Sequence, residues 1–139
     1  MFGALIVTHG RLAHELLNAA QTIEGPIERV EAVPLDWNES VDEAREKIRQ
    51  ALDRITDDSG VIIFTDMFGG TPSNISLSFL EQNRVEIVTG VNLPMVVKFC
   101  SLRNNENSLA DLAHLIREKG SKSIRVASDL LAKETIQGS

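Results

Sequence analysis

The sequence is poor in cysteine, in aromatic residues and in long apolar runs. Its 139 residues include one cysteine, Cys100, so no internal disulfide can form, which fits a reducing cytoplasm. No apolar run approaches the roughly 20 residues that a membrane-spanning helix needs. Residues 2–7 are apolar but too few for a signal peptide, and no basic segment precedes them. We therefore expect a cytoplasmic protein.

Positive charge is also scarce. Fourteen Lys and Arg residues against 20 Asp and Glu give a net charge of −6, which argues against a nucleic-acid partner because phosphate backbones require a basic face. A phosphate group would have to be held locally, by backbone N–H groups and a few side chains. No set of His, Cys and acidic residues has the spacing of metal ligands. We expect neither a metal nor a cofactor.

What the sequence does contain is an alternation of short apolar runs and helical patterns. The helical patterns are signalled by Ser40 with Glu43 (a capping box), by Thr71 as a cap before Pro72, and by Ser108 as a cap. Gly25-Pro26 is expected to end the first helix and Gly120 to end the last. The apolar runs predict strands at residues 2–7, 27–34, 61–64, 85–88 and 124–127.

Alternating strands and helices predict an α/β fold with a mainly parallel sheet covered by helices on both faces. We expect a single three-layer, flavodoxin-like domain over residues 1–127, with strand order 2-1-3-4, and a loose polar tail over residues 128–139. In such sheets ligands bind at the carboxyl ends of the strands, beside the switch point between the first and third strands.

Two polar side chains follow the strands that flank this switch point. His9 ends the first strand and Asp66 follows the third, 57 positions later in the chain. A carboxylate bonded to one ring nitrogen of histidine fixes the tautomer and leaves the other nitrogen free as a nucleophile. The same carboxylate would stabilise positive charge on the ring as a phosphoryl group arrives.

The segment after Asp66 predicts a place for that group. Gly69 and Gly70 let the backbone approach closely, and the helix that follows offers unpaired N–H groups at its positive end. Thr71 and Ser73 add hydroxyl donors. Taken singly, each feature has an ordinary explanation as an incidental histidine, a capping aspartate or a turn that leads into a helix. Their convergence at one sheet edge favours a phosphate or phosphoryl site.

Other polar and aromatic residues are expected to play lesser parts. His14 is predicted to be an ordinary helix-surface residue, a rim contact with partners being the alternative, and His114 to be a structural or exposed helix residue. Trp37 follows the second strand and is expected mainly to pack in the core or its loop, the rim of the site being the alternative. Asn92 and Pro94 follow the fourth strand, where they either shape the site or a dimer contact, or only cap a helix.

Three motifs in this order resemble the IIA component of the mannose family of the bacterial sugar phosphotransferase system. They are THG at residues 8–10, DMFGGTPSN at 66–74 and GVNLPM at 90–95, and the similarity extends to about residue 126. The resemblance implies a cytoplasmic homodimer whose last strand is antiparallel and often exchanged between subunits. It implies phosphorylation of His9 at Nε2 by the phosphocarrier protein HPr, with Asp66 on Nδ1 and Thr71 beside the phosphoryl group.

The resemblance also implies that the phosphoryl group passes to a IIB component, which phosphorylates a sugar entering through membrane components. The chain would touch the membrane only indirectly, and because no IIB domain follows, a separate IIB partner is expected. One alternative is a stand-alone regulatory domain that senses phosphorylation state; another is a phosphoryl donor subunit for dihydroxyacetone kinase. A histidine phosphatase is less well supported, because Thr8 stands where such enzymes usually carry arginine.

Overall fold

The computed structural model describes residues 1–104 and 107–138, with side chains described as far as residue 132. Strands β1 and β3 form the centre of a four-stranded parallel sheet whose order, β2-β1-β3-β4, is the predicted one. The strands are β1 (Gly3–His9), β2 (Val30–Leu35), β3 (Val61–Thr65) and β4 (Val85–Thr89). The helices are α1 (Leu12–Glu24), α2 (Val41–Ile55), α3 (Thr71–Leu77), α4 (Leu93–Leu102), α5 (Leu109–Lys122) and α6 (Ala127–Gly138).

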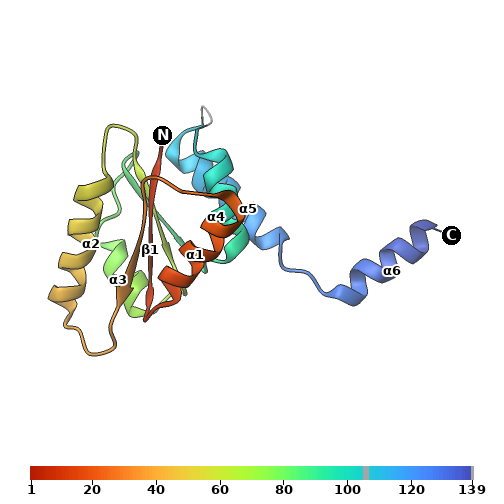
Figure 1. Ribbon diagram of the computed structural model, residues 1–139, viewed down its shortest axis with the longest axis horizontal. Coiled ribbons are helices and arrows are strands. Elements are labelled where there is room, and N and C mark those ends of the chain that lie inside the picture. Colours follow the sequence, from red (N-terminus) through yellow and green to blue (C-terminus); the bar gives the residue numbers. More distant parts are fainter. Residues whose placement is uncertain (105–106, 139) are drawn as a thin grey trace.

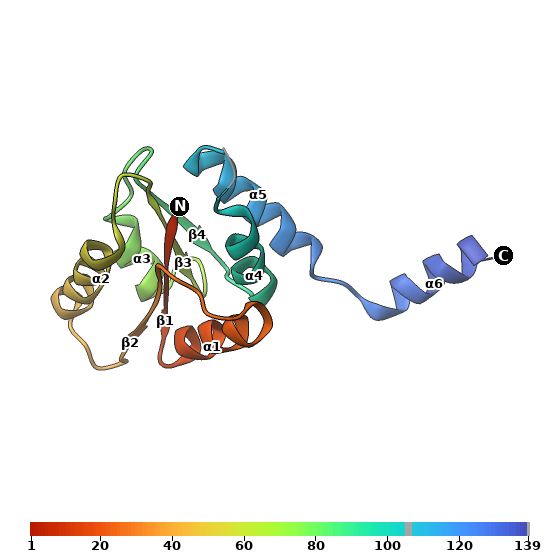
Figure 2. The ribbon, with the colours of Figure 1, turned by 45° about the horizontal axis from the view of Figure 1, so that its top comes forward.

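Helices cover both faces of the sheet (Figures 1 and 2). Successive residues of a strand point to opposite faces, so Ala4 and Ile6 of β1 pack with α1, α4 and α5, whereas Leu5 and Val7 pack with α2 and α3. Both core clusters consist mainly of Leu, Ile, Val and Ala, with Phe64 and Phe99 as the large fully buried rings. The apolar strand sequences therefore reflect burial on both faces.

Most of the predicted helix boundaries are confirmed. Ser40 Oγ accepts a hydrogen bond from the N–H of Glu43 at 3.1 Å, and Ser108 Oγ accepts one from Asp111 at 3.1 Å. Gly25 ends α1 with φ of +86°. The second strand begins at Val30 and not at residue 27, because Arg29, with φ of +57°, interrupts the extended backbone.

The C-terminal segment differs from the prediction. Residues 124–126 form no strand, and residues 127–138 form helix α6 where a loose tail was expected. The chain leaves α5 in a direction that carries this segment away from the sheet (Figures 1 and 2). The antiparallel last strand exchanged between subunits, which the family resemblance implies, stays a prediction. Within this chain the strand predicted at residues 124–127 is not formed, because the short apolar alternation from Ile124 to Val126 pairs with no strand of the described sheet. Both of these side chains are largely exposed.

Gly120 does not end α5, which continues to Lys122. Gly120 is a buried residue of α5 and faces the first turn of α4. A Cβ atom added to it would lie 2.3 Å from Met95 Cγ. Asn92 fixes the same contact, since its Oδ1 accepts from the N–H of Met95 at 3.1 Å and its Nδ2 donates to the carbonyl of Gly120 at 3.2 Å. Gly120 is therefore required for close helix packing and not for helix termination.

A larger side chain at position 120 should destabilise the fold. We expect Gly120→Val to lower the free energy of unfolding by about 2–3 kcal/mol, because the branched side chain must displace Met95. Urea unfolding of this variant is compared with that of Ser121→Val, a substitution at the exposed neighbouring position of the same helix. Equal losses in the two variants would show that helix propensity, and not the contact with Met95, causes the effect.

Candidate functional site

The turn after β1 places His9 at the carboxyl edge of the sheet. Thr8 is fully buried, and its Oγ1 accepts a hydrogen bond from the N–H of Ala13 at 2.8 Å, which anchors the start of α1. Gly10 adopts φ of +55°, a conformation that glycine takes without strain, and its N–H donates to the carbonyl of Leu35 at 2.9 Å. His9 lies between these two fixed residues, so its position is set by the turn.

The structure brings Asp66 into direct contact with His9. The neighbouring strands β1 and β3 are in parallel register, with Val7 opposite Thr65, so the residues after both strands meet at one edge. Asp66 Oδ2 lies 2.7 Å from His9 Nδ1 and also accepts the backbone N–H of His9 at 3.0 Å. Oδ1 accepts the N–H of Met67 at 3.0 Å. Three contacts therefore hold the carboxylate in one orientation.

This geometry assigns the two ring nitrogens of His9 different roles. A carboxylate can only accept hydrogen bonds, so Nδ1 carries the proton that faces it and Nε2 keeps its lone pair in the neutral ring. The His9 side chain is 21% exposed and that of Asp66 13% exposed. The pair is thus sheltered on most sides, while the imidazole is still accessible from solvent. Such an arrangement can present a nucleophilic nitrogen to an incoming group.

The glycine turn after Asp66 lies against the edge of the imidazole. A Cβ atom added to Gly70 would stand 3.0 Å from His9 Cε1 and 3.6 Å from Nε2, so the backbone approaches the ring more closely than a side chain would allow. Gly69 adopts φ of +86° at this turn. Gly70, and not Thr71 as predicted, caps α3, and its carbonyl accepts from the N–H of Asn74 at 2.9 Å.

The two predicted hydroxyl donors lie in different environments. Thr71, the first residue of α3, is exposed at this edge. Ser73 is fully buried, and its Oγ has no hydrogen-bond partner among the described residues. Only Thr71 therefore offers its hydroxyl at the surface beside the glycine turn.

Trp37 does not pack in the core as mainly expected. It is 79% exposed, and its ring stacks on that of His9 with centroids 4.8 Å apart and planes 23° from parallel. The alternative, a place at the rim of the site, is the correct one. The contact with His9 itself was missed, although Trp37 follows β2 at the same carboxyl edge, a signal that could have suggested it.

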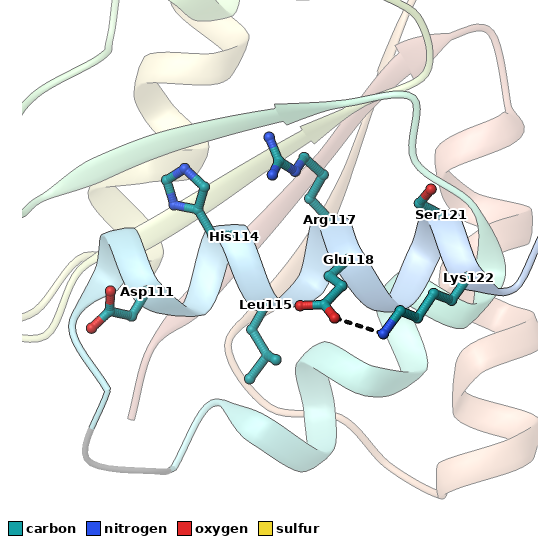
Figure 3. Close-up of a pocket in the computed structure, with 7 residues that line it drawn as sticks. All are labelled: Asp111, His114, Leu115, Arg117, Glu118, Ser121 and Lys122. Atoms are coloured by element: carbon teal, nitrogen blue, oxygen red, sulfur yellow. Dashed lines mark hydrogen bonds and ion pairs between the residues drawn. The ribbon is translucent and has the colours of Figure 1, made fainter.

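The other residues considered from the sequence belong to helices or to their caps. Asn92 caps α4, as described above, which favours the capping explanation. His14 lies partly buried in α1. His114 lies in a hollow on the surface of α5 (Figure 3). Its Nδ1 lies 2.8 Å from the carbonyl of Ala110. That hollow is lined from a single helix and includes none of the residues around His9.

Neither a membrane span nor a metal centre is found in the part of the chain that the structure describes. No helix there is long and apolar enough to cross a bilayer. His, Cys, Asp and Glu side chains there form no cluster of three or more that could hold a metal ion. The chemistry of the site must be considered from the side chains and backbone already named.

Comparison with known proteins identifies the family to which the chain belongs. Residues 3–116 match the family model described as "PTS system fructose IIA component". The chain belongs to this family of sugar phosphotransferase system (PTS) IIA components. The match covers β1 to β4 and most of α5, and so includes every residue of the site described above.

Individual relatives agree with this assignment. The chain is 34% identical over 134 residues to the PTS system fructose-specific EIIA component of Bacillus subtilis, covering 96% of this chain and 91% of that protein. It is 30% identical over 122 residues to the mannose-specific EIIAB component of Escherichia coli, covering 87% of this chain but only 38% of that longer protein.

Solved structures of IIA proteins share the fold. The PTS IIA protein associated with the fucose utilization operon of Streptococcus pneumoniae superposes with a TM-score of 0.81 at 30% identity, covering 94% of this chain and 96% of the other. The EIIA component from Streptococcus agalactiae superposes with a TM-score of 0.84 over 93% of this chain and 99% of the other, at 23% identity, a similarity that shows the fold alone.

Proposed function

We propose that this protein is a phosphoryl carrier that accepts phosphate from phospho-HPr on His9 and transfers it to a IIB component. The observation that carries the proposal is the 2.7 Å contact between His9 Nδ1 and Asp66, which leaves Nε2 as the nucleophile in a sheltered but accessible position. Family membership supports a phosphotransferase role, since the related proteins are named as components of the PTS.

The proposed step forms one bond and breaks one. The lone pair of Nε2 attacks the phosphorus of the donor, and the bond between that phosphorus and its donor nitrogen breaks as the new nitrogen–phosphorus bond forms. The imidazole becomes positively charged, and the carboxylate of Asp66 stabilises it through the Nδ1 proton, which stays on the ring. Transfer to the IIB component is the same displacement with His9 as the leaving group.

The Gly69-Gly70-Thr71 turn is proposed to receive the phosphoryl oxygens. Gly70 lies beside the ring edge that carries Nε2, where only backbone fits, and the exposed Thr71 follows it directly. Backbone N–H groups and one hydroxyl would then hold the phosphoryl group in a chain whose net charge is −6. Ser73, which was expected to join them, has a buried hydroxyl and is proposed to support the turn from behind.

Sugar uptake is the output we favour over the regulatory and kinase-donor alternatives, because two relatives matched over 91% and 96% of their own length carry the sugar-specific names fructose and sorbose. We place the carrier in the cytoplasm, with its domain over residues 1–127. We also propose a homodimer. The exposed apolar side chains of Ile124, Val126 and Leu130 lie on the segment outside the body of the domain and suit a contact with a second copy.

The proposal is tested by incubating the protein with phosphoenolpyruvate, enzyme I and HPr and measuring acid-labile phosphate by intact-mass spectrometry. We expect one phosphoryl group per chain and its loss when a cognate IIB component is added. Phosphorylation without discharge to any IIB component would favour the regulatory alternative. Absence of labelling would contradict the carrier function.

A further inference from the structure

The single tryptophan of the chain makes a contact that the carrier function does not by itself require. Trp37 lies between β2 and α2, with one face stacked on the His9 imidazole and 79% of its surface exposed. So large an exposed area means that burial in a core does not hold this side chain in place. The stacking contact and the loop that carries the residue must do so.

Hydrogen bonds and an ion pair hold the loop that carries Trp37 on both sides of that residue. Glu39 Oε1 accepts the N–H of Asp36 at 2.8 Å, and the N–H of Glu39 donates to the carbonyl of Asp36 at 3.2 Å. Lys47 of α2 pairs with the same carboxylate and donates to the carbonyl of Pro34 at 3.3 Å. These bonds close a short turn around Trp37 and tie it to the first turns of α2.

Glu39 keeps its charge in this turn. Desolvation by itself raises the pKa of the carboxyl group, but the hydrogen bonds from Lys47 and from the N–H of Asp36, together with the charge of Lys47, lower it further than burial raises it. The pKa therefore lies below its ordinary value. The turn is thus held by a carboxylate that stays ionised at neutral pH, and Trp37 is presented over His9 from a fixed position.

The stack with Trp37 restricts a tilt of the His9 imidazole that the hydrogen bond with Asp66 still permits. A single hydrogen bond to Nδ1 determines which nitrogen is free, but the imidazole can still tilt about that bond. An aromatic ring 4.8 Å away and 23° from parallel restricts the plane of the imidazole, and the Gly70 backbone limits movement of the Cε1 edge. An indole face also attracts positive charge, and the imidazole becomes positive when Nε2 is phosphorylated.

We propose that Trp37 is a positioning residue for His9, which holds the imidazole plane so that Nε2 faces the incoming phosphorus and stabilises the charged ring after transfer. This inference rests on the proposed function for its kinetic consequence, but the stack itself exists in the unphosphorylated protein. The two can therefore be tested separately.

The first measurement is the NMR signal of the His9 ring protons in the unphosphorylated protein. The ring current of the indole should shift these signals, so Trp37→Ala should move them toward the values of a free imidazole, whereas Trp37→Phe should move them less. Phe68→Ala is the matched control, because Phe68 is also an exposed aromatic residue near this edge, at 76% exposure, whereas the ring stacked on His9 is that of Trp37. This variant should move the His9 signals less than Trp37→Ala does. Unchanged His9 signals in Trp37→Ala would overturn the proposal whether or not the protein carries phosphate.

The second measurement is the rate of phosphoryl transfer from phospho-HPr as a function of its concentration. We expect Trp37→Ala to lower kcat about threefold to tenfold with KM changed less than about twofold, and Trp37→Phe to restore most of kcat. A rise in KM with unchanged kcat would overturn the positioning role and indicate a docking contact instead. If wild type takes no phosphate while the His9 signals respond as expected, the carrier function fails and the stack stands.

Discussion

His9→Ala is expected to take up no acid-labile phosphate from phosphoenolpyruvate, enzyme I and HPr under conditions that label the wild-type chain fully. The variant lacks Nε2, the nucleophile of the proposed transfer. It should still fold, because Asp66 keeps two of its three hydrogen bonds, those from the backbone N–H groups of residues 9 and 67. The measurement is the mass increase of the intact protein before and after mild acid treatment.

The other two histidines of the chain provide controls for this experiment. His114→Ala removes an exposed imidazole whose Nδ1 lies 2.8 Å from the carbonyl of Ala110 within its own helix, so its labelling should equal that of wild type. His14→Ala removes the nearest other histidine in the sequence, and its labelling should also equal that of wild type. Labelling of His9→Ala at the wild-type level would remove His9 from the mechanism, and loss of labelling in His114→Ala would point to α5.

Asp66→Asn is expected to slow phosphoryl transfer about 100-fold or more while leaving the fold intact. An asparagine has nearly the same shape, but its amide can donate to Nδ1 and so favour the tautomer in which Nε2 is protonated and cannot attack. It also removes the negative charge that stabilises the phosphorylated ring. Rates should fall in both directions, from phospho-HPr to His9 and from His9 to the IIB component, as measured by rapid-quench kinetics.

Two comparisons make the Asp66 result specific. Asp58→Asn removes one negative charge from an exposed loop position and should transfer at the wild-type rate. A thermal melt of Asp66→Asn is needed because the amide offers only one acceptor to the N–H groups that Asp66 now satisfies with two oxygens. Wild-type rates in a folded Asp66→Asn would show that the tautomer is fixed by other groups.

The sheet and the meeting of His9 with Asp66 could be predicted from the sequence because both follow from local patterns and a general rule. Runs such as Val61 to Phe64 are apolar at every position, which indicates strands buried on both faces, and parallel strands bring their carboxyl ends together. The caps at Ser40 and Ser108 are equally local, since a hydroxyl and an N–H three residues later decide them.

What could not be predicted depends on contacts between distant segments. A glycine at position 120 is typical of a helix end, but Gly120 is needed inside α5 because Met95 of α4 packs against it. Whether residues 124–126 pair with the sheet depends on the direction in which the chain leaves α5, and no short sequence pattern predicts that direction. For Trp37 the sequence favours packing in the core or its loop, whereas in the structure Glu39 and Lys47 hold its loop with the side chain exposed.

The central claim is that Nε2 of His9 carries the phosphoryl group while Asp66 holds Nδ1. The most direct test is a ¹H–¹⁵N NMR spectrum of the histidine side chains recorded after phosphorylation by HPr. The account predicts coupling of phosphorus to Nε2 of His9, with the Nδ1 proton retained and hydrogen-bonded. Phosphorus on Nδ1 of His9, or on any other residue, would contradict it.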